Sequence, residues 1–184
     1  MKTIHTYLMA LFVGIIAISC SDDDGNEPII INEEEVITTV RVQLTEGTNM
    51  VTLESLDDDG DDGPNAPVFT ISGPLTANTT YTGTVTFLNE IEDPAEDITE
   101  EVEEESDEHQ VFFTPASGLN ITTTATNFDG NGNPLGTEFT LTTGDASTGN
   151  FTVTLRHEPT KPNTGLADAG GETDVEVTFN VTVQ

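Results

Sequence analysis

Residues 175–183 read VEVTFNVTV, and this stretch decides the fold class. Val175, Val177, Phe179, Val181 and Val183 alternate with polar residues along it. An alternation with period two is typical of a β-strand that buries one face and exposes the other. We therefore expect this segment to be a strand with its valines and its phenylalanine in a core.

The same alternation recurs toward the N-terminus, first in residues 36–44, where Val40, Val42 and Leu44 share one face. Seven further segments are short, rich in β-branched or aromatic residues and bounded by turn residues: 50–53, 68–72, 81–88, 110–114, 119–126, 138–143 and 151–157. Strands at this spacing, with no helices alternating between them, predict an all-β fold. We expect an immunoglobulin-like antiparallel β-sandwich of about seven to nine strands.

One segment departs from this pattern, because residues 90–108 carry twelve carboxylates. Asp93 is placed to cap a short acidic helix, with Pro94 at its first position. A thin apolar stripe would then consist of Ile91, Ala95, Ile98 and Val102. Like-charged pairs four residues apart would cost about 0.2 to 0.5 kcal/mol each. A bound cation would remove that cost.

Charge excludes one class of partner. The chain has 34 acidic and 4 basic side chains, which gives a formal net charge of -30. Binding to nucleic acid requires a basic surface that displaces counterions from phosphates. We therefore exclude nucleic acid as a partner.

The N-terminus predicts export and lipid anchoring. Residues 1–19 combine a lysine, a short apolar stretch and small residues, as in a signal peptide. Ala17-Ile18-Ser19-Cys20 resembles the lipobox of bacterial lipoproteins, which implies that Cys20 becomes an acylated N-terminus embedded in a lipid bilayer. The following residues, Ser21, Asp22, Asp23 and Asp24, resemble the acidic surface-export signal of Bacteroidota lipoproteins, although an ordinary solvated linker would look the same.

These features divide the chain into a signal peptide at 1–19, an acidic flexible tether at 20–35 and a β-sandwich domain at 36–184. We expect a lipoprotein of the outer membrane, exposed at the cell surface.

Metal binding is the most specific hypothesis for the domain. Its two histidines each adjoin an acid, as Glu108-His109 and His157-Glu158. Imidazole with carboxylates suits zinc or copper, whereas carboxylates alone suit calcium. The histidines lie far apart in the sequence, and their spacing matches no compact ligand motif. The alternative is that both histidines only end strands while the acids face water.

A loop offers a candidate calcium site. Asn127, Asp129, Asn131 and Glu138 occupy positions one, three, five and twelve of an EF-hand spacing, with Gly132 at position six. However, Asn stands where Asp is usual, and strands flank the loop where an EF-hand has helices. A hairpin turn explains the segment equally well.

Catalysis finds little support in the sequence. There is no Gly-x-Ser-x-Gly motif, no second cysteine and no cluster of histidines. A glycosidase requires only two carboxylates, so a carboxylate-based hydrolase stays a less favoured alternative. We predict a protein that is not an enzyme.

Several stretches resemble a known family, among them GPLTANTTYTGTVTFLNE, DEHQ, LRHEP and GGETDVEVTFNVTVQ. The chain is similar over nearly the whole of its mature part, residues 20–184, to flavobacterial lipoproteins usually labelled type 1 periplasmic binding fold superfamily proteins. That label implies two lobes of alternating strands and helices, for which this chain is too short and too rich in strands. The resemblance implies a cell-envelope lipoprotein, with a TonB-dependent outer-membrane receptor as a plausible partner.

Three classes of function follow. A cation-binding module predicts that His109 and His157 converge beside acids, whereas a structural or adhesion module without a metal predicts that they lie apart. A hydrolase requires a cleft with two carboxylates about 5 to 10 Å apart. We favour the binding module.

Overall fold

The computed structural model describes residues 35–60 and 63–184, and its strands form two sheets. The larger sheet has the order β3 (Val68–Ile71), β2 (Asn49–Leu56), β1 (Thr39–Glu46), β4 (Thr80–Asn89), β8 (Glu138–Thr143) and β7 (Ile121–Ala125), with β5 (Glu96–Asp97) also paired to β4. The smaller sheet has the order β10 (Glu172–Val183), β9 (Ser147–His157) and β6 (His109–Pro115). All strand pairs between these elements are antiparallel.

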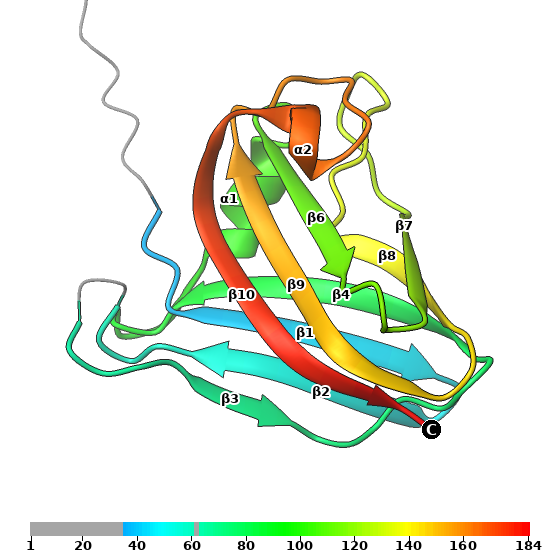
Figure 1. Ribbon diagram of the computed structural model, residues 1–184. Helices are drawn as coiled ribbons and strands as arrows, with labels where there is room; N and C mark the ends of the chain where they lie inside the picture. The colour runs from blue at the N-terminus through cyan, green and yellow to red at the C-terminus, as the bar shows by residue number, and fades with distance from the viewer. Residues whose placement is uncertain (1–34, 61–62) are drawn as a thin grey trace, which may run out of the picture. The chain divides into compact units, whose positions relative to one another are not determined.

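The two sheets pack face to face and enclose one core (Figure 1). Phe87 and Phe139 from the larger sheet and Phe151 and Phe179 from the smaller sheet are almost fully buried between the layers. The predicted antiparallel β-sandwich is therefore confirmed, and each of the nine predicted strands is present.

Alternation along the strands explains the burial. Val40, Val42 and Leu44 of β1 are buried as predicted. Phe179, Val181 and Val183 of β10 are buried as well, whereas Val175 and Val177 are only half-buried at the other end of the strand. The sandwich is thus open at the end where β10 begins.

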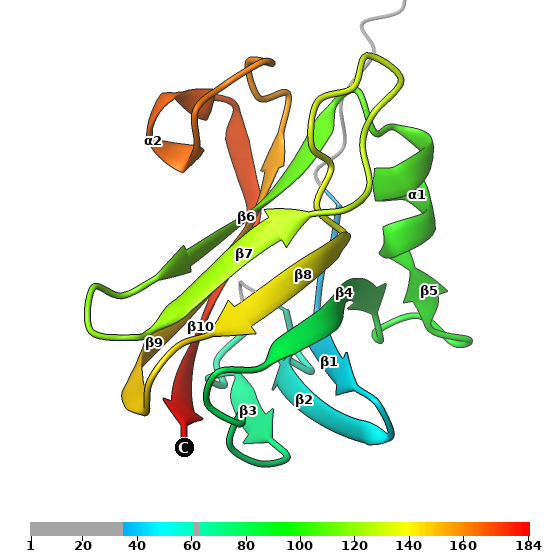
Figure 2. The same ribbon diagram turned by 90° about the vertical axis from the view of Figure 1, so that its right-hand side faces the viewer.

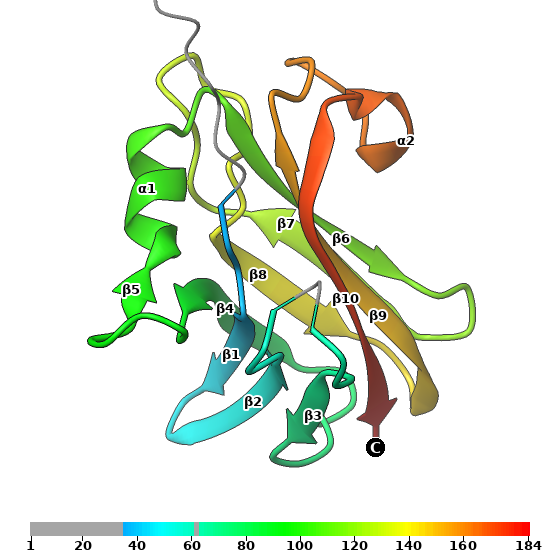
Figure 3. The same ribbon diagram turned by 90° about the vertical axis from the view of Figure 1, so that its left-hand side faces the viewer.

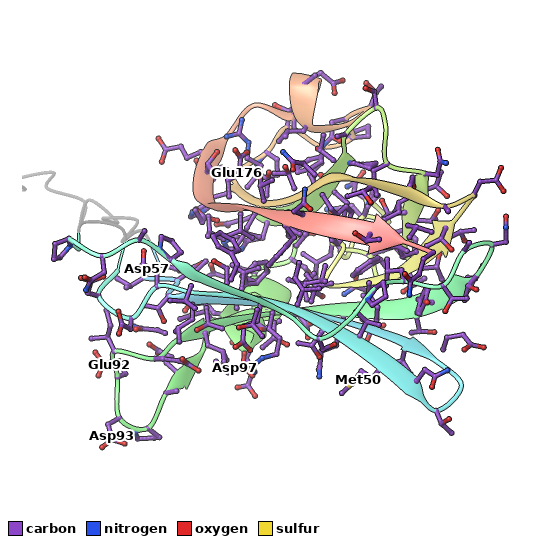
Figure 4. All side chains as sticks on the ribbon, turned by 60° about the horizontal axis from the view of Figure 1, so that its bottom comes forward. Met50, Asp57, Glu92, Asp93, Asp97 and Glu176 are labelled. Carbon is purple, nitrogen blue, oxygen red and sulfur yellow. The ribbon has the colours of Figure 1, made fainter. Side chains whose placement is uncertain are left out.

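The short acidic helix begins later in the chain than predicted. Helix α1 spans Ile98–Glu104, and its N-cap is Asp97, whose side chain accepts a hydrogen bond from the Thr99 backbone N–H at 3.0 Å. Residues 96 and 97 pair with β4 as β5, and this pairing holds them extended where the sequence pattern predicts helix. Figure 4 shows Asp93, the predicted cap, at the tip of the loop that precedes β5. Ile98 and Val102 are buried as expected, but Ile91 and Ala95 are exposed.

Two helices flank one end of the smaller sheet. Figures 2 and 3 show α1 on one side of the end where β6 begins, and α2 (Leu166–Ala169) on the other side. Among the described residues, no helix has the length and apolar character needed to cross a membrane. The end of the sheet between α1 and α2 carries both histidines of the domain.

Candidate metal centre

Strand pairing brings the two histidines together. In the antiparallel register of β6 and β9, His109 lies directly opposite His157, and their rings stack with centroids 4.7 Å apart. Both side chains continue the inward-facing rows of their strands, so His109 is fully buried and His157 is 5% exposed. Of the two geometries distinguished from the sequence, convergence is the one found.

A third residue, Asp174, reaches the same place because of a β-bulge. The register between β9 and β10 shifts between Thr173 and Val175, which leaves Asp174 as the extra residue. A bulge turns a side chain away from the face that strict alternation would give it. The Asp174 side chain is only 2% exposed, whereas an unbulged strand would put it outward with Glu176.

A glycine allows β10 to start close to His157. Gly171 has φ of +71°, and a Cβ at this position would lie 2.2 Å from the backbone oxygen of His157. Only glycine combines this conformation with this close approach. The Gly170-Gly171 turn therefore lets the Asp174 bulge form beside the histidine pair.

The three side chains have the spacing of metal ligands. Asp174 Oδ2 lies 3.9 Å from His109 Nε2, and Asp174 Oδ1 lies 3.9 Å from His157 Nδ1. One ligand atom from each of the three residues lies within 4.8 Å of the other two. Donors about 2.0 to 2.1 Å from a tetrahedral zinc ion are roughly 3.3 Å apart, so small side-chain movements would close the site on an ion.

The surroundings of His109 determine which of its ring nitrogens carries the proton and which carries the unshared electron pair. Its Nδ1 lies 3.3 Å from the backbone oxygen of Glu105, which can only accept a hydrogen bond, so Nδ1 carries the proton in the neutral ring. Nε2 then has an unshared electron pair and faces Glu35 Oε1 at 3.3 Å. No contact of Nε2 with the described residues has the geometry of a hydrogen bond.

Electron pairs that face each other in a buried place favour a positive charge between them. Burial lowers the pKa of His109, but the carboxylates of Glu35 and Asp174 outweigh that effect. The pKa of His109 is therefore raised above its ordinary value. The cluster attracts a cation, and the smallest one available is a proton.

Glu35 is packed against the domain. Its side chain is 9% exposed, and its Oε2 has no hydrogen bond to the described residues. The described part of the domain thus includes Glu35, the residue at which the sequence analysis ended the tether. Glu35 groups with His109 and Glu105, apart from the group that contains His109, His157 and Asp174.

The two acids named from the sequence lie at the rim. Glu108 Oε2 is 3.9 Å from His157 Nε2, but the Glu108 side chain is 59% exposed. Glu158 is also exposed and forms a second, outer group with His157 and Glu108. His109, His157, Glu108 and Glu158 thus all lie together, with the histidines inside and the glutamates facing water.

Lys161 fixes the turn that leads into β6. Its ammonium donates to the backbone oxygens of Ser106 and His109 at 2.6 Å each, and lies 3.4 Å from Asp129 Oδ2. Burial lowers the pKa of Lys161, although Asp129 counteracts part of this effect. The lysine therefore holds the backbone of His109 in place from outside the cluster.

The loop proposed for calcium is held together by its own donors. The Asp129 carboxylate accepts hydrogen bonds from the Asn131 and Asn133 backbones and from the Asn133 side chain. Asn127 Oδ1 accepts from the backbones of Gly136 and Glu138. Of the four candidate residues Asn127, Asp129, Asn131 and Glu138, the first two thus already direct side-chain oxygens at N–H donors of the loop. The geometry is that of a turn, the alternative stated for this segment from the sequence.

No family model, curated protein or solved structure matches this chain. The predictions for Cys20 and for the acidic run after it lie outside the described residues.

Proposed function

We propose that the domain is a binding module for a divalent transition-metal ion, held by His109, His157 and Asp174. The observation that supports it is the buried Nε2 of His109, which faces two carboxylates and makes no hydrogen bond to the described residues. Buried polar atoms in folded proteins nearly always have a partner, and an imidazole electron pair directed at carboxylates is the arrangement that a cation completes.

The donor set favours zinc or copper over calcium. Two imidazole nitrogens and a carboxylate are the ligands of borderline metals, whereas calcium takes six to eight oxygens. The bond from His109 Nδ1 to the Glu105 backbone oxygen supports the same choice, because such an outer hydrogen bond orients most metal-binding histidines.

The sequence motifs indicate where in the cell this module would act. A lipid on Cys20 would anchor the chain in the outer membrane, at the cell surface if the acidic run acts as an export signal. The module would then take up a cation, or a chelate of it, and pass it to a TonB-dependent receptor. This part of the proposal comes from the sequence motifs and the family resemblance.

The alternative is an interaction or structural lipoprotein without a metal. The raised pKa of His109 favours it, because a proton can also neutralise the cluster. The two functions differ in whether a metal ion displaces that proton.

Competition with a chromophoric chelator tests the proposal. The protein would be the chain starting at Ser21, which keeps every described element, and the ions would be zinc, copper and calcium. We expect one equivalent of zinc or copper to bind, and no calcium at equal concentration. Asp174→Asn, His109→Gln and His157→Gln should each weaken binding by more than about 100-fold, the upper range for loss of a supporting residue.

Glu46→Gln is the matched control, because it also removes one negative charge but at the exposed far end of β1. Its affinity should equal that of the wild type. Affinity that survives the histidine substitutions, or the absence of zinc and copper binding, would contradict the proposal.

A further inference from the structure

A cavity of about 300 Å³ lies between the two sheets at the end where β10 begins. Ile37 and Val40 line it from the side of the larger sheet, and Val175 and Val177 line it from β10. Asp174 is also part of its wall. The cavity therefore adjoins the candidate metal centre through one of the three proposed ligands.

Three protein ligands leave one position of a tetrahedral ion open. His109, His157 and Asp174 form one group, and Glu35 is not within ligand distance of all of them. A three-ligand zinc site with an open position holds water or an external ligand there. The cavity beside Asp174 is large enough for such a ligand, because a single water molecule needs only about 30 Å³.

The walls of the cavity determine which ligand fits. Its charged groups are the carboxylates of Asp57, Asp174 and Glu176, and none of the described residues that line it is basic. Figure 4 shows Asp57 and Glu176 on the two different layers at the same end of the sandwich. Negative walls on a chain of net charge -30 disfavour carboxylate or phosphate ligands.

The remaining walls are uncharged, and they combine apolar residues with Thr38, Ser55 and Thr173. Ile37, Val40, Val175 and Val177 offer carbon surface that would pack against a ring or a short alkyl group. A nitrogen donor suits walls that are either acidic or uncharged, since imidazole and amines bind zinc or copper as uncharged bases.

We propose that this cavity holds an external ligand of the bound ion, and that this ligand is a small uncharged nitrogen donor, an imidazole or an amine. The inference rests on the proposed metal site and names the class of molecule that completes it. The ion would then be carried together with its organic ligand.

The test uses cobalt(II), whose visible absorption reports coordination, in the chain starting at Ser21. Imidazole and acetate are added separately to the cobalt-loaded protein. We expect the spectral shift to saturate as imidazole is added. Acetate should bind at least about tenfold more weakly than imidazole. Equal binding of acetate and imidazole would overturn the inference.

Two substitutions locate the ligand. Val177→Phe fills the cavity from β10, and Thr178→Phe is its matched control, because Thr178 points outward from the same strand. Val177→Phe should bind cobalt as the wild type does, but its cobalt-loaded form should bind imidazole at least about tenfold more weakly. Thr178→Phe should keep the wild-type affinity for both cobalt and imidazole. Ile37→Phe fills the cavity from the opposite wall and should repeat the result if Val177→Phe fails to fold.

The outcomes separate the two proposals. A chain that binds no cobalt overturns the metal site and this inference together. Cobalt binding with no imidazole response, or with a response that both cavity-filling variants retain, overturns this inference alone.

Discussion

Two regions of this domain bury a carboxylate, and they differ in what surrounds it. Around Asp129, backbone and side-chain N–H groups and the ammonium of Lys161 all donate to the acid. Beside Asp174 lie the rings of His109 and His157, and Glu35 faces His109 from another side. One carboxylate lies among amide donors and an ammonium, whereas the other shares an imidazole nitrogen with a second acid.

The difference separates an acid that is engaged within the fold from the acid that we propose as a metal ligand. Burial raises the pKa of Asp129, but its hydrogen bonds and Lys161 outweigh this effect and hold the pKa below its usual range. This acid is therefore ionised and engaged within the fold, and it needs no outside cation. Beside Asp174, by contrast, the buried electron pair of His109 is left for a cation. For that reason a metal site is proposed there and not in the loop that contains Asp129.

The largest effect on stability is expected at Asp129. Asp129→Ala removes the acceptor of three hydrogen bonds and the partner of a buried ammonium, so it should lower the free energy of unfolding by about 3 kcal/mol. Chemical denaturation measures the change. Asp107→Asn, which alters an acid that contacts the side chain of Asn131 in the same loop, should change stability by less than about 0.5 kcal/mol. Equal losses of stability from the two substitutions would show that Asp129 is not a structural acid.

At Asp174, a substitution is expected to leave the free energy of unfolding unchanged or to raise it. Without a metal, and at a pH above the folded pKa of His109, Asp174→Asn removes one of the two carboxylates that face the buried Nε2 of His109 and adds an N–H donor. The metal-free chain should be as stable as the wild type or more stable, by up to about 1 kcal/mol, in the same denaturation experiment. A loss as large as that from Asp129→Ala would mean that Asp174 is also a structural acid.

The pH dependence of stability sharpens the contrast further. Because the folded pKa of His109 is raised, its protonation stabilises the metal-free fold fully below the unfolded value of about 6.5. This contribution is lost as the pH rises through the folded pKa. The stability difference between wild type and His109→Gln should therefore shrink from pH 5.5 to pH 9. A difference that grows with pH would contradict the assignment.

The smallest effect is expected at the rim. Glu108→Gln and Glu158→Gln alter exposed acids beside His157, so zinc affinity should fall by no more than about threefold, as for other exposed charge pairs. A chelator competition resolves a change of that size. A loss close to that of Asp174→Asn would move the binding site outward to the group of Glu108, His157 and Glu158.

The fold was predictable because alternation in each strand is a local property. The burial of residues such as Val42 and Phe179 follows from the period-two alternation of the sequence around them. The start of the acidic helix was less predictable, since pairing of residues 96 and 97 with β4 competes with helix formation and depends on distant residues.

The site was predictable only in part. Both histidines were identified from their acidic neighbours, but the register that sets His109 opposite His157 joins segments that are distant in the sequence. Asp174 was missed because strict alternation places it outward, and only the bulge reverses this. The Gly170-Gly171 pair just before the strand is the one local signal that an irregular start was needed. Glu35 was missed because its acidic neighbours in the sequence resemble a linker.

X-ray absorption spectroscopy of the zinc-loaded chain tests the central claim most directly. The account predicts one bound zinc with two imidazole nitrogens and at least one carboxylate oxygen at about 2.0 to 2.1 Å, and loss of one imidazole in His109→Gln. A shell of oxygens alone, or a spectrum that is unchanged in His109→Gln, would show that the ion binds elsewhere on the acidic surface and would contradict the account.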